Sequence, residues 1–108
     1  MRQTFEKLVL DGIPARLEAR GVRFAARTAS SDEMKPLLRA KLVEEVDELL
    51  SAATPDQVLE EIADISEVLA ALAERYGADA AEMRARQIAK RCDRGGFERG
   101  IVLRWTED

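Results

Sequence analysis

The chain has 108 residues, of which 46% are hydrophobic and 35% are charged, and its formal net charge is -4. That length allows one domain with a modest core, so we expect a single domain over residues 1–108. The composition excludes both a disordered chain and a membrane-spanning one. The negative net charge argues against broad DNA binding, and no stable nucleic-acid partner is expected.

Two residue types are scarce. Histidine is absent and Cys92 is the only cysteine, which excludes imidazole or paired-thiolate metal sites, a disulfide framework and Ser-His-Asp catalysis. Acid–base or metal chemistry is therefore left to carboxylates, Lys, Arg, Tyr and the backbone. No apolar run approaches the roughly 20 residues that cross a bilayer, and nothing at the start resembles a signal peptide. We expect a cytoplasmic protein without a membrane partner.

Helical periodicity dominates the chain after its first 30 residues, and the expected fold class is all-α, a bundle of about four helices. Residues 5–10, FEKLVL, form a short apolar stretch that Asp11 and Gly12 interrupt. A brief first helix is predicted from Pro14 to Arg20, where Gly21 stops it.

Two longer helices follow in the middle of the chain. The second begins at Ser30 or Ser31, where Ser30 and Glu33 form a capping-box pattern, and it runs to about residue 52. The third is predicted from Pro55 to about residue 76, with Thr54 as its cap. Because only about two residues connect them, these helices are expected to pack antiparallel.

The last third of the chain holds a fourth helix and a tail. The helix is predicted to start at Asp79, with Glu82 completing a capping box, and to end at Gly95 and Gly96. The tail contains the apolar run IVLRW, residues 101–105, which is typical of a strand. We expect this run to form a short terminal β-pairing with residues 7–10.

Seven acidic residues lie in two runs, EEVDE on the second predicted helix and EEIAD on the third. A projection at about 100° per residue places Glu45 and Glu61 within the apolar stripes of their helices. Glu48 and Asp64 lie at the margins of those stripes. The remaining acids of the two runs point elsewhere: Glu44, Asp47 and Glu60.

Carboxylates that converge between two helices cost free energy unless positive charge neutralises them. Lys41 is near enough to offset part of this charge as an ordinary ion pair. Oxygen ligands favour hard divalent cations, so the sequence predicts a Mg²⁺ or Mn²⁺ site. Its expected ligands are Glu45, Glu48, Glu61 and Asp64. The alternative is that these acids are exposed and form intrahelical pairs.

Three segments of the chain carry motifs that occur together in one family of known proteins. The first is Glu45-x-x-Glu48, followed after twelve residues by Glu61-x-x-Asp64. The second is KLVLDGIP, residues 7–14. The third is a closing segment formed by Lys90, Arg94, Gly95, Gly96, Phe97 and residues 101–103. In this order, over nearly the whole chain, they resemble the MazG-like superfamily of all-α nucleoside triphosphate pyrophosphohydrolases, which includes phosphoribosyl-ATP pyrophosphohydrolases and dimeric dUTPases.

The resemblance implies a fold, an activity and site residues. The fold is a MazG-like helical bundle completed by dimerisation. The activity is the Mg²⁺-dependent hydrolysis of a nucleoside triphosphate, standard or modified, to the monophosphate and pyrophosphate. The four acids are then metal ligands, and Glu48 is the candidate for orienting the attacking water, although another glutamate could do so. Lys90 and Arg94 would contact phosphate; equally, they complement the carboxyl end of their helix.

Partners and alternatives follow from the same comparison. The expected partners are a nucleotide substrate and further copies of the chain, in a homodimer or homotetramer. Self-association is also predicted by apolar residues outside the main stripes: Leu37, Val43, Leu50, Ala63 and Ala70. KLVLDGIP is similar to the KLVRDKIP signature of a house-cleaning subgroup, but Leu10 and Gly12 stand where Arg and Lys are usual. A phosphoribosyl-ATP-type enzyme and a non-catalytic dimerisation or regulatory module are the alternatives.

Overall fold

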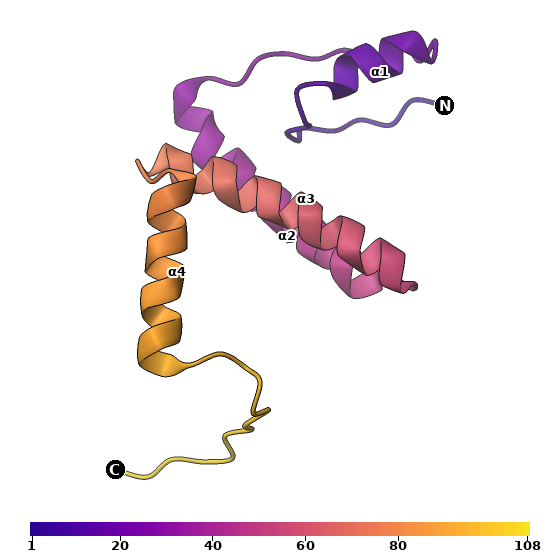
Figure 1. Cartoon of the computed structure of the whole chain (residues 1–108). Helices are drawn as coiled ribbons and strands as arrows, with labels where there is room; N and C mark the ends of the chain where they lie inside the picture. The colour runs from indigo at the N-terminus through magenta and orange to yellow at the C-terminus, as the bar shows by residue number, and fades with distance from the viewer. The chain divides into compact units, whose positions relative to one another are not determined.

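A computed structural model describes all 108 residues, which form four α-helices and no β-strand (Figure 1). The chain divides into two compact units, residues 1–77 and 78–108. The first contains α1 (Ile13–Ala19), α2 (Ser31–Ser51) and α3 (Pro55–Arg75), and the second contains α4 (Ala80–Arg94). The all-α prediction is confirmed, whereas the single domain stays a prediction. No helix is long and apolar enough to span a membrane.

Helices α2 and α3 form an antiparallel hairpin in which the two helices lie side by side (Figure 1). At the start of α3, Thr54 Oγ1 accepts a hydrogen bond from the Gln57 amide at 3.2 Å, and Gln57 Oε1 accepts from the Thr54 amide at 3.3 Å. This reciprocal cap and Pro55 at the first helical position fix where α3 begins. The connection between α2 and α3 is short because this cap starts α3 soon after α2 ends.

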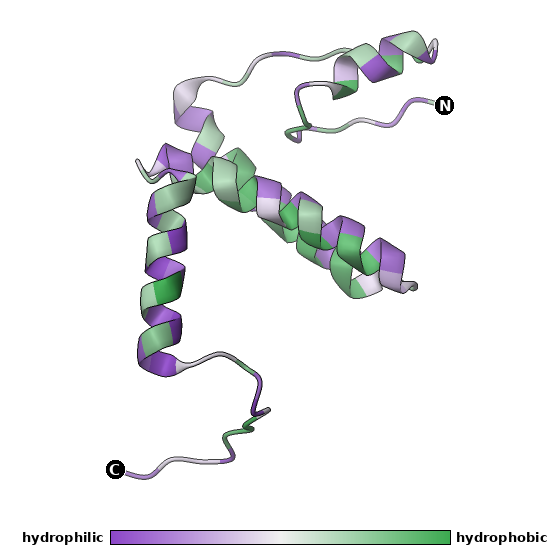
Figure 2. Ribbon diagram, viewed as in Figure 1, coloured by the Kyte–Doolittle hydropathy of each residue, from purple (hydrophilic) through white to green (hydrophobic).

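The hairpin buries few apolar side chains. Leu38 on α2 and Val68 on α3 are its only buried hydrophobic residues, with 5% and 7% of their surface exposed. Figure 2 shows apolar and polar residues alternating along both helices. Other large apolar residues of the two helices remain exposed: Val43, Val46, Leu50, Leu59, Ile62 and Leu69. The apolar stripes predicted from the sequence are therefore only partly covered within one chain.

The segment before α2 is attached to the hairpin by ion pairs. Lys7 Nζ lies 2.8 Å from Glu44 Oε1, and Arg27 bridges Glu33 at 2.8 Å and Glu6 at 3.3 Å. Between these anchors the chain turns at residues 10–13 and enters α1 with Pro14 in its first turn. The turn places Val9, Leu10 and Ile13 beside the hairpin, where they line a pocket with it.

The second unit contains α4 and the tail. Asp79 Oδ1 accepts a hydrogen bond from the Glu82 amide at 2.9 Å, which is half of the predicted capping box. The other half is wrong, because Glu82 Oε1 binds Arg86 at 2.9 Å and not the Asp79 amide. An arginine one turn later is a charged donor for this exposed carboxylate. Gly95, at a φ of 84°, ends the helix in a conformation that favours glycine.

The predicted terminal β-pairing is wrong. Neither residues 7–10 nor residues 101–105 form a strand. In the tail, Ile101, Val102 and Trp105 are between 74% and 82% exposed. Apolar composition favours a strand only where a partner supplies backbone hydrogen bonds, and an isolated two-stranded pair is marginal in water. Residues 7–10 are held instead by the Lys7–Glu44 ion pair and by the turn that follows.

Candidate metal centre

The acidic site lies between α2 and α3. Each helix contributes two acids three residues apart, a spacing that puts both on one helix face. Glu45 from α2 meets Glu61 and Asp64 from α3, and each of the three offers a carboxylate oxygen within 4.8 Å of the others. The hairpin thus joins residues that are 16 to 19 positions apart in the sequence. The register of each helix and the packing of α2 against α3 together produce this convergence.

A second acidic group shares Glu45 with the first. Oxygens of Glu44, Glu45 and Glu48 also lie within 4.8 Å of one another. Glu48 is exposed, in agreement with its predicted place at the rim of the stripe. The expectation that Glu44 points elsewhere is wrong. Its carboxylate is half-buried because Lys7, from a segment that a helix projection ignores, draws it toward the site.

Burial separates Glu45 from an ordinary surface acid. The residue is only 6% exposed, and its Oε2 is buried without a hydrogen-bond partner. Oε2 of Glu61 is buried without a partner as well. Leaving a buried polar atom unpaired costs about 1–3 kcal/mol, and more when the atom is charged. Two orphaned carboxylate oxygens on facing helices are therefore a feature that a bound cation would stabilise.

The environment of Glu61 favours its neutral form. Burial of the carboxyl, its hydrogen bond with Glu45 and the negative charges of Glu48, Glu45 and Asp64 together raise its pKa from 4.5 to about 7. A proton retained on Glu61 can be shared with the facing Glu45. Near neutral pH, Glu61 can therefore either keep its proton or lose it and present a carboxylate to a cation beside Glu45.

Two lysines offset part of the negative charge. Lys41 Nζ lies 3.3 Å from Glu45 Oε1 and 3.4 Å from Glu44 Oε2, which agrees with the ion pair expected for it. Lys7 binds the other oxygen of Glu44, and this hydrogen bond is the main cause of the lowered pKa of Glu44. Both lysines lie on the α2 side. No ion pair reaches Glu48, Glu61 or Asp64.

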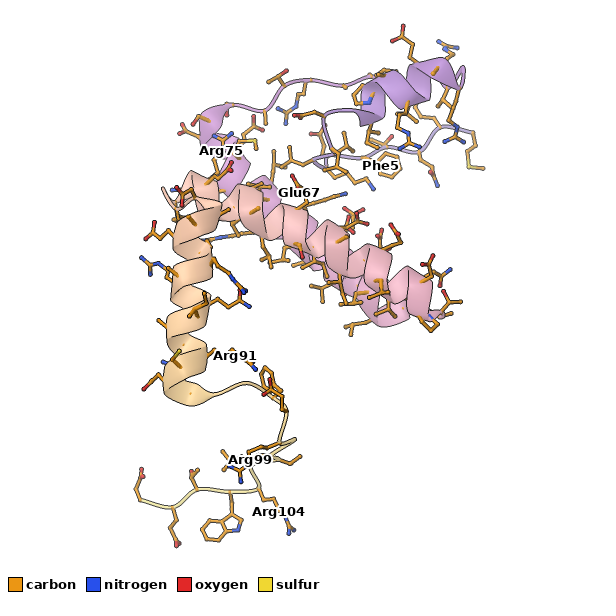
Figure 3. The ribbon with its side chains drawn as sticks, viewed as in Figure 1. Phe5, Glu67, Arg75, Arg91, Arg99 and Arg104 are labelled. Atoms are coloured by element: carbon orange, nitrogen blue, oxygen red, sulfur yellow. The ribbon has the colours of Figure 1, made fainter.

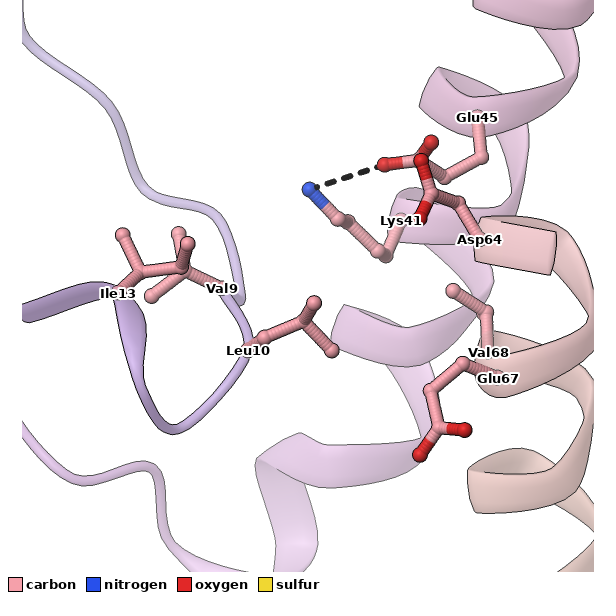
Figure 4. A pocket seen from close by; sticks show the side chains of 8 residues that line it. All are labelled: Val9, Leu10, Ile13, Lys41, Glu45, Asp64, Glu67 and Val68. Carbon is pink, nitrogen blue, oxygen red and sulfur yellow. Dashed lines mark ion pairs between the residues drawn. The ribbon is translucent and has the colours of Figure 1, made fainter. Parts of the chain in front are cut away.

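A pocket of about 230 Å³ opens beside the acids (Figure 4). Its apolar wall is supplied by Val9 and Leu10, before α1, and by Ile13, the first residue of α1. Lys41 is the only cation that lines the pocket. Leu10 faces the hairpin in Figure 4. The pocket is completed by Glu45, Asp64, Glu67 and Val68.

Three residues near the site were missed by sequence reasoning. Glu67 follows Asp64 by three residues, so helical spacing from a predicted ligand was a usable signal for it. Glu44 follows Lys41 at the same spacing, which indicated a local ion pair. Lys7 carried no signal, because its pair with Glu44 joins positions 37 residues apart.

The predicted phosphate contacts, Lys90 and Arg94, belong to the second unit. They lie four residues apart near the end of α4, and both are exposed. Arg91 and Arg94 occupy the last turn, where cations complement the helix carboxyl end. Arg91, labelled in Figure 3, pairs with Glu98, and Arg94 Nε lies 3.8 Å from Asp93 Oδ2. Phosphate binding by Lys90 and Arg94 stays a prediction.

Comparison with known proteins leaves the local geometry as the main guide to function. No family model, curated protein or solved structure matches this chain. The likeness to MazG-like pyrophosphohydrolases therefore consists of the three motifs.

Proposed function

We propose that this protein hydrolyses a nucleoside triphosphate to the monophosphate and pyrophosphate with the help of Mg²⁺. One observation carries the proposal: Glu45 of α2 lies together with Glu61 and Asp64 of α3, and buried oxygens of Glu45 and Glu61 have no partner. An acid that serves solubility alone has no reason to bury its carboxylate, as Glu45 does. The motif resemblance supplies the reaction class.

The residues present fit a hard divalent cation. Every available ligand is a carboxylate oxygen, the ligand type that Mg²⁺ and Mn²⁺ prefer. We propose Glu45, Glu48, Glu61 and Asp64 as the residues that hold the ion. When bound, Mg²⁺ supplies charge for the phosphate oxygens and lowers the pKa of a coordinated water.

The chain's own side chains have distinct proposed roles. Glu45 is fixed by Lys41 and by burial, so it anchors the site. Glu48 is exposed beside Glu45, where it can accept a proton from the attacking water and orient it. Phosphoryl transfer needs mainly positioning and charge stabilisation, which carboxylates and cations can supply. Lys41, which lines the pocket, is the cation of this unit that is proposed to meet the phosphates.

A second copy of the chain is the proposed partner. The α2–α3 hairpin buries only Leu38 and Val68, while Val43, Leu50 and Leu59 are more than 60% exposed. Two such hairpins packed together would form a four-helix bundle with a continuous core. A homodimer, or a homotetramer of two dimers, would bury these residues.

Pyrophosphate release is the direct test of the proposed reaction. Purified protein is incubated with standard and modified nucleoside triphosphates in Mg²⁺ or Mn²⁺. At least one nucleotide should yield monophosphate and pyrophosphate in equal amounts, with no release in chelator. Glu61→Ala should reduce the rate by 10²-fold or more, whereas Glu60→Ala, a neighbouring exposed acid outside both groups, should not. No release from any nucleotide, or equal rates for wild type and Glu61→Ala, would refute the proposed function.

A further inference from the structure

The pocket beside the acids has two chemically different sides. Glu45 and Asp64 form its acidic edge, and Val9, Leu10, Ile13 and Val68 form an apolar wall (Figure 4). Metal-bound phosphates would need the acidic edge alone. The apolar wall is therefore unexplained by phosphate chemistry and fits a flat, weakly polar group attached to the phosphates.

The size of the pocket limits what enters it. Its volume of about 230 Å³ lies below the ~300–1,000 Å³ typical of sites that enclose a whole drug-sized ligand. It has room for one part of a nucleotide and not for all of it. Because the acidic edge is where the proposed metal holds the phosphates, the part that remains for the apolar side is the base.

Glu67 is a polar residue that lines the pocket together with the apolar wall. It lies on α3 one turn after Asp64, lines the pocket and forms no ion pair (Figures 3 and 4). An ionised carboxylate only accepts hydrogen bonds. It therefore favours a base edge that donates and disfavours an edge that presents a carbonyl oxygen.

We propose that the Val9–Leu10–Ile13–Val68 wall holds the substrate's base and that Glu67 selects bases with an exocyclic amino group. This specificity rests on the proposed function, because it describes the same site and the same reaction. A carboxylate accepts from an amino group in the way that Glu and Asp accept from the amino group of cytosine. A carbonyl at the same position would instead meet a second acceptor and lose the hydrogen bond.

Two pairs of nucleotides isolate this contact. CTP and UTP differ at C4 by an amino group against a carbonyl, and ATP and ITP differ in the same way at C6. In Mg²⁺, kcat/KM should be about tenfold or more higher for CTP than for UTP and for ATP than for ITP. The factor should fall short of the roughly 10⁴-fold reached in buried hydrogen-bonding sites, because Glu67 is exposed.

Glu67→Gln is the decisive variant. A glutamine amide both accepts and donates, so it can meet either edge, and the CTP/UTP and ATP/ITP ratios should fall toward one. Glu74→Gln is the matched control. It removes the same charge from the same helix seven residues later, outside the pocket, and it should keep the wild-type ratios. Leu10→Ser should raise KM for all four nucleotides with little change in kcat.

The outcomes separate this inference from the proposed function. If wild type hydrolyses nucleotides without preferring the amino member of either pair, or if Glu67→Gln retains the preference, base selection by Glu67 is refuted while pyrophosphohydrolysis stands. If none of the four nucleotides, nor any other triphosphate, releases pyrophosphate, the proposed function itself has failed.

Discussion

Glu45 is the residue on which the account of the site depends. The residue is 6% exposed, and its carboxylate has lost most of its hydration. Lys41 compensates one of its oxygens with an ion pair at 3.3 Å. Its second oxygen has no partner. Glu61 faces it with another orphaned oxygen, so without a bound cation the ionised form of Glu61 is disfavoured and its pKa is raised.

Removing the charge of Lys41 should lower the stability of the protein. Lys41→Met keeps much of the aliphatic length but deletes the charge shared by Glu44 and Glu45. In chelator we expect the free energy of unfolding to fall by about 1–2 kcal/mol, because a buried charge loses its partner. Saturating Mg²⁺ should recover part of this loss. Urea denaturation with and without Mg²⁺ measures both effects, and an unchanged midpoint in chelator would contradict the compensating role of Lys41.

The pKa of Glu61 predicts how metal-free stability depends on pH. Its folded pKa of about 7 lies above its ordinary value of 4.5, so the stability it contributes is fully present below pH 4.5. That contribution is lost as pH rises through about 7, because the unfolded chain releases the proton more readily. In chelator, the urea midpoint of wild type should fall from pH 5 to pH 8 by more than that of Glu61→Gln. Equal pH dependence of the two proteins would argue against a raised pKa.

At the scale of the helices, local sequence was sufficient for most of the fold. Thr54 and Pro55 mark the start of α3, and Asp79 caps α4, through contacts within a few residues. Helical register, together with the antiparallel packing expected from a short connection, predicts that Glu45, Glu61 and Asp64 lie together. Helical register says nothing about the segment before α1. The Lys7–Glu44 pair and the place of Leu10 in the pocket wall could therefore not be predicted from it.

The cap of α3 allows a test of the hairpin as an element. Thr54 Oγ1 and Gln57 Oε1 satisfy two backbone amides that would otherwise lack partners at the start of α3. Thr54→Ala should lower the free energy of unfolding by about 1 kcal/mol. The predicted ligands Glu61 and Asp64 lie further along α3 than its cap. The same variant should therefore weaken Mn²⁺ binding only slightly. Chemical denaturation measures the first effect, and a change below about 0.3 kcal/mol would indicate that the cap contributes little.

At the scale of the whole molecule, one chain leaves its central hairpin incompletely covered. Isolated exposed apolar residues are normal on a protein surface, but Val43, Leu50 and Leu59 lie on two helices that contact each other. The sequence predicted apolar residues outside the main stripes and hence self-association. It had no means of fixing which residues of a second copy would meet them, because that geometry depends on the assembled surface.

Self-association should be visible in the molar mass. Light scattering after size-exclusion chromatography should give about twice the 12.0 kDa of one chain, or a higher multiple. Leu50 is 79% exposed in one chain, so Leu50→Asp should not disturb its fold but should lower the mass toward that of a monomer. Ser51→Asp, at the next exposed position of α2, controls for the added charge. A wild-type mass of one chain at micromolar concentration would contradict the proposed dimer.

Metal binding by the four acids is the central claim, and Mn²⁺ titration followed by electron paramagnetic resonance tests it without requiring turnover. The signal of free Mn²⁺ should disappear as wild-type protein is added, and excess Mg²⁺ should restore it. Glu45→Gln and Glu61→Gln should each weaken binding by tenfold or more, because each removes a predicted ligand. Glu60→Gln should bind like wild type. Binding by wild type that is no stronger than by Glu45→Gln and Glu61→Gln would contradict the claim that these acids form a metal site.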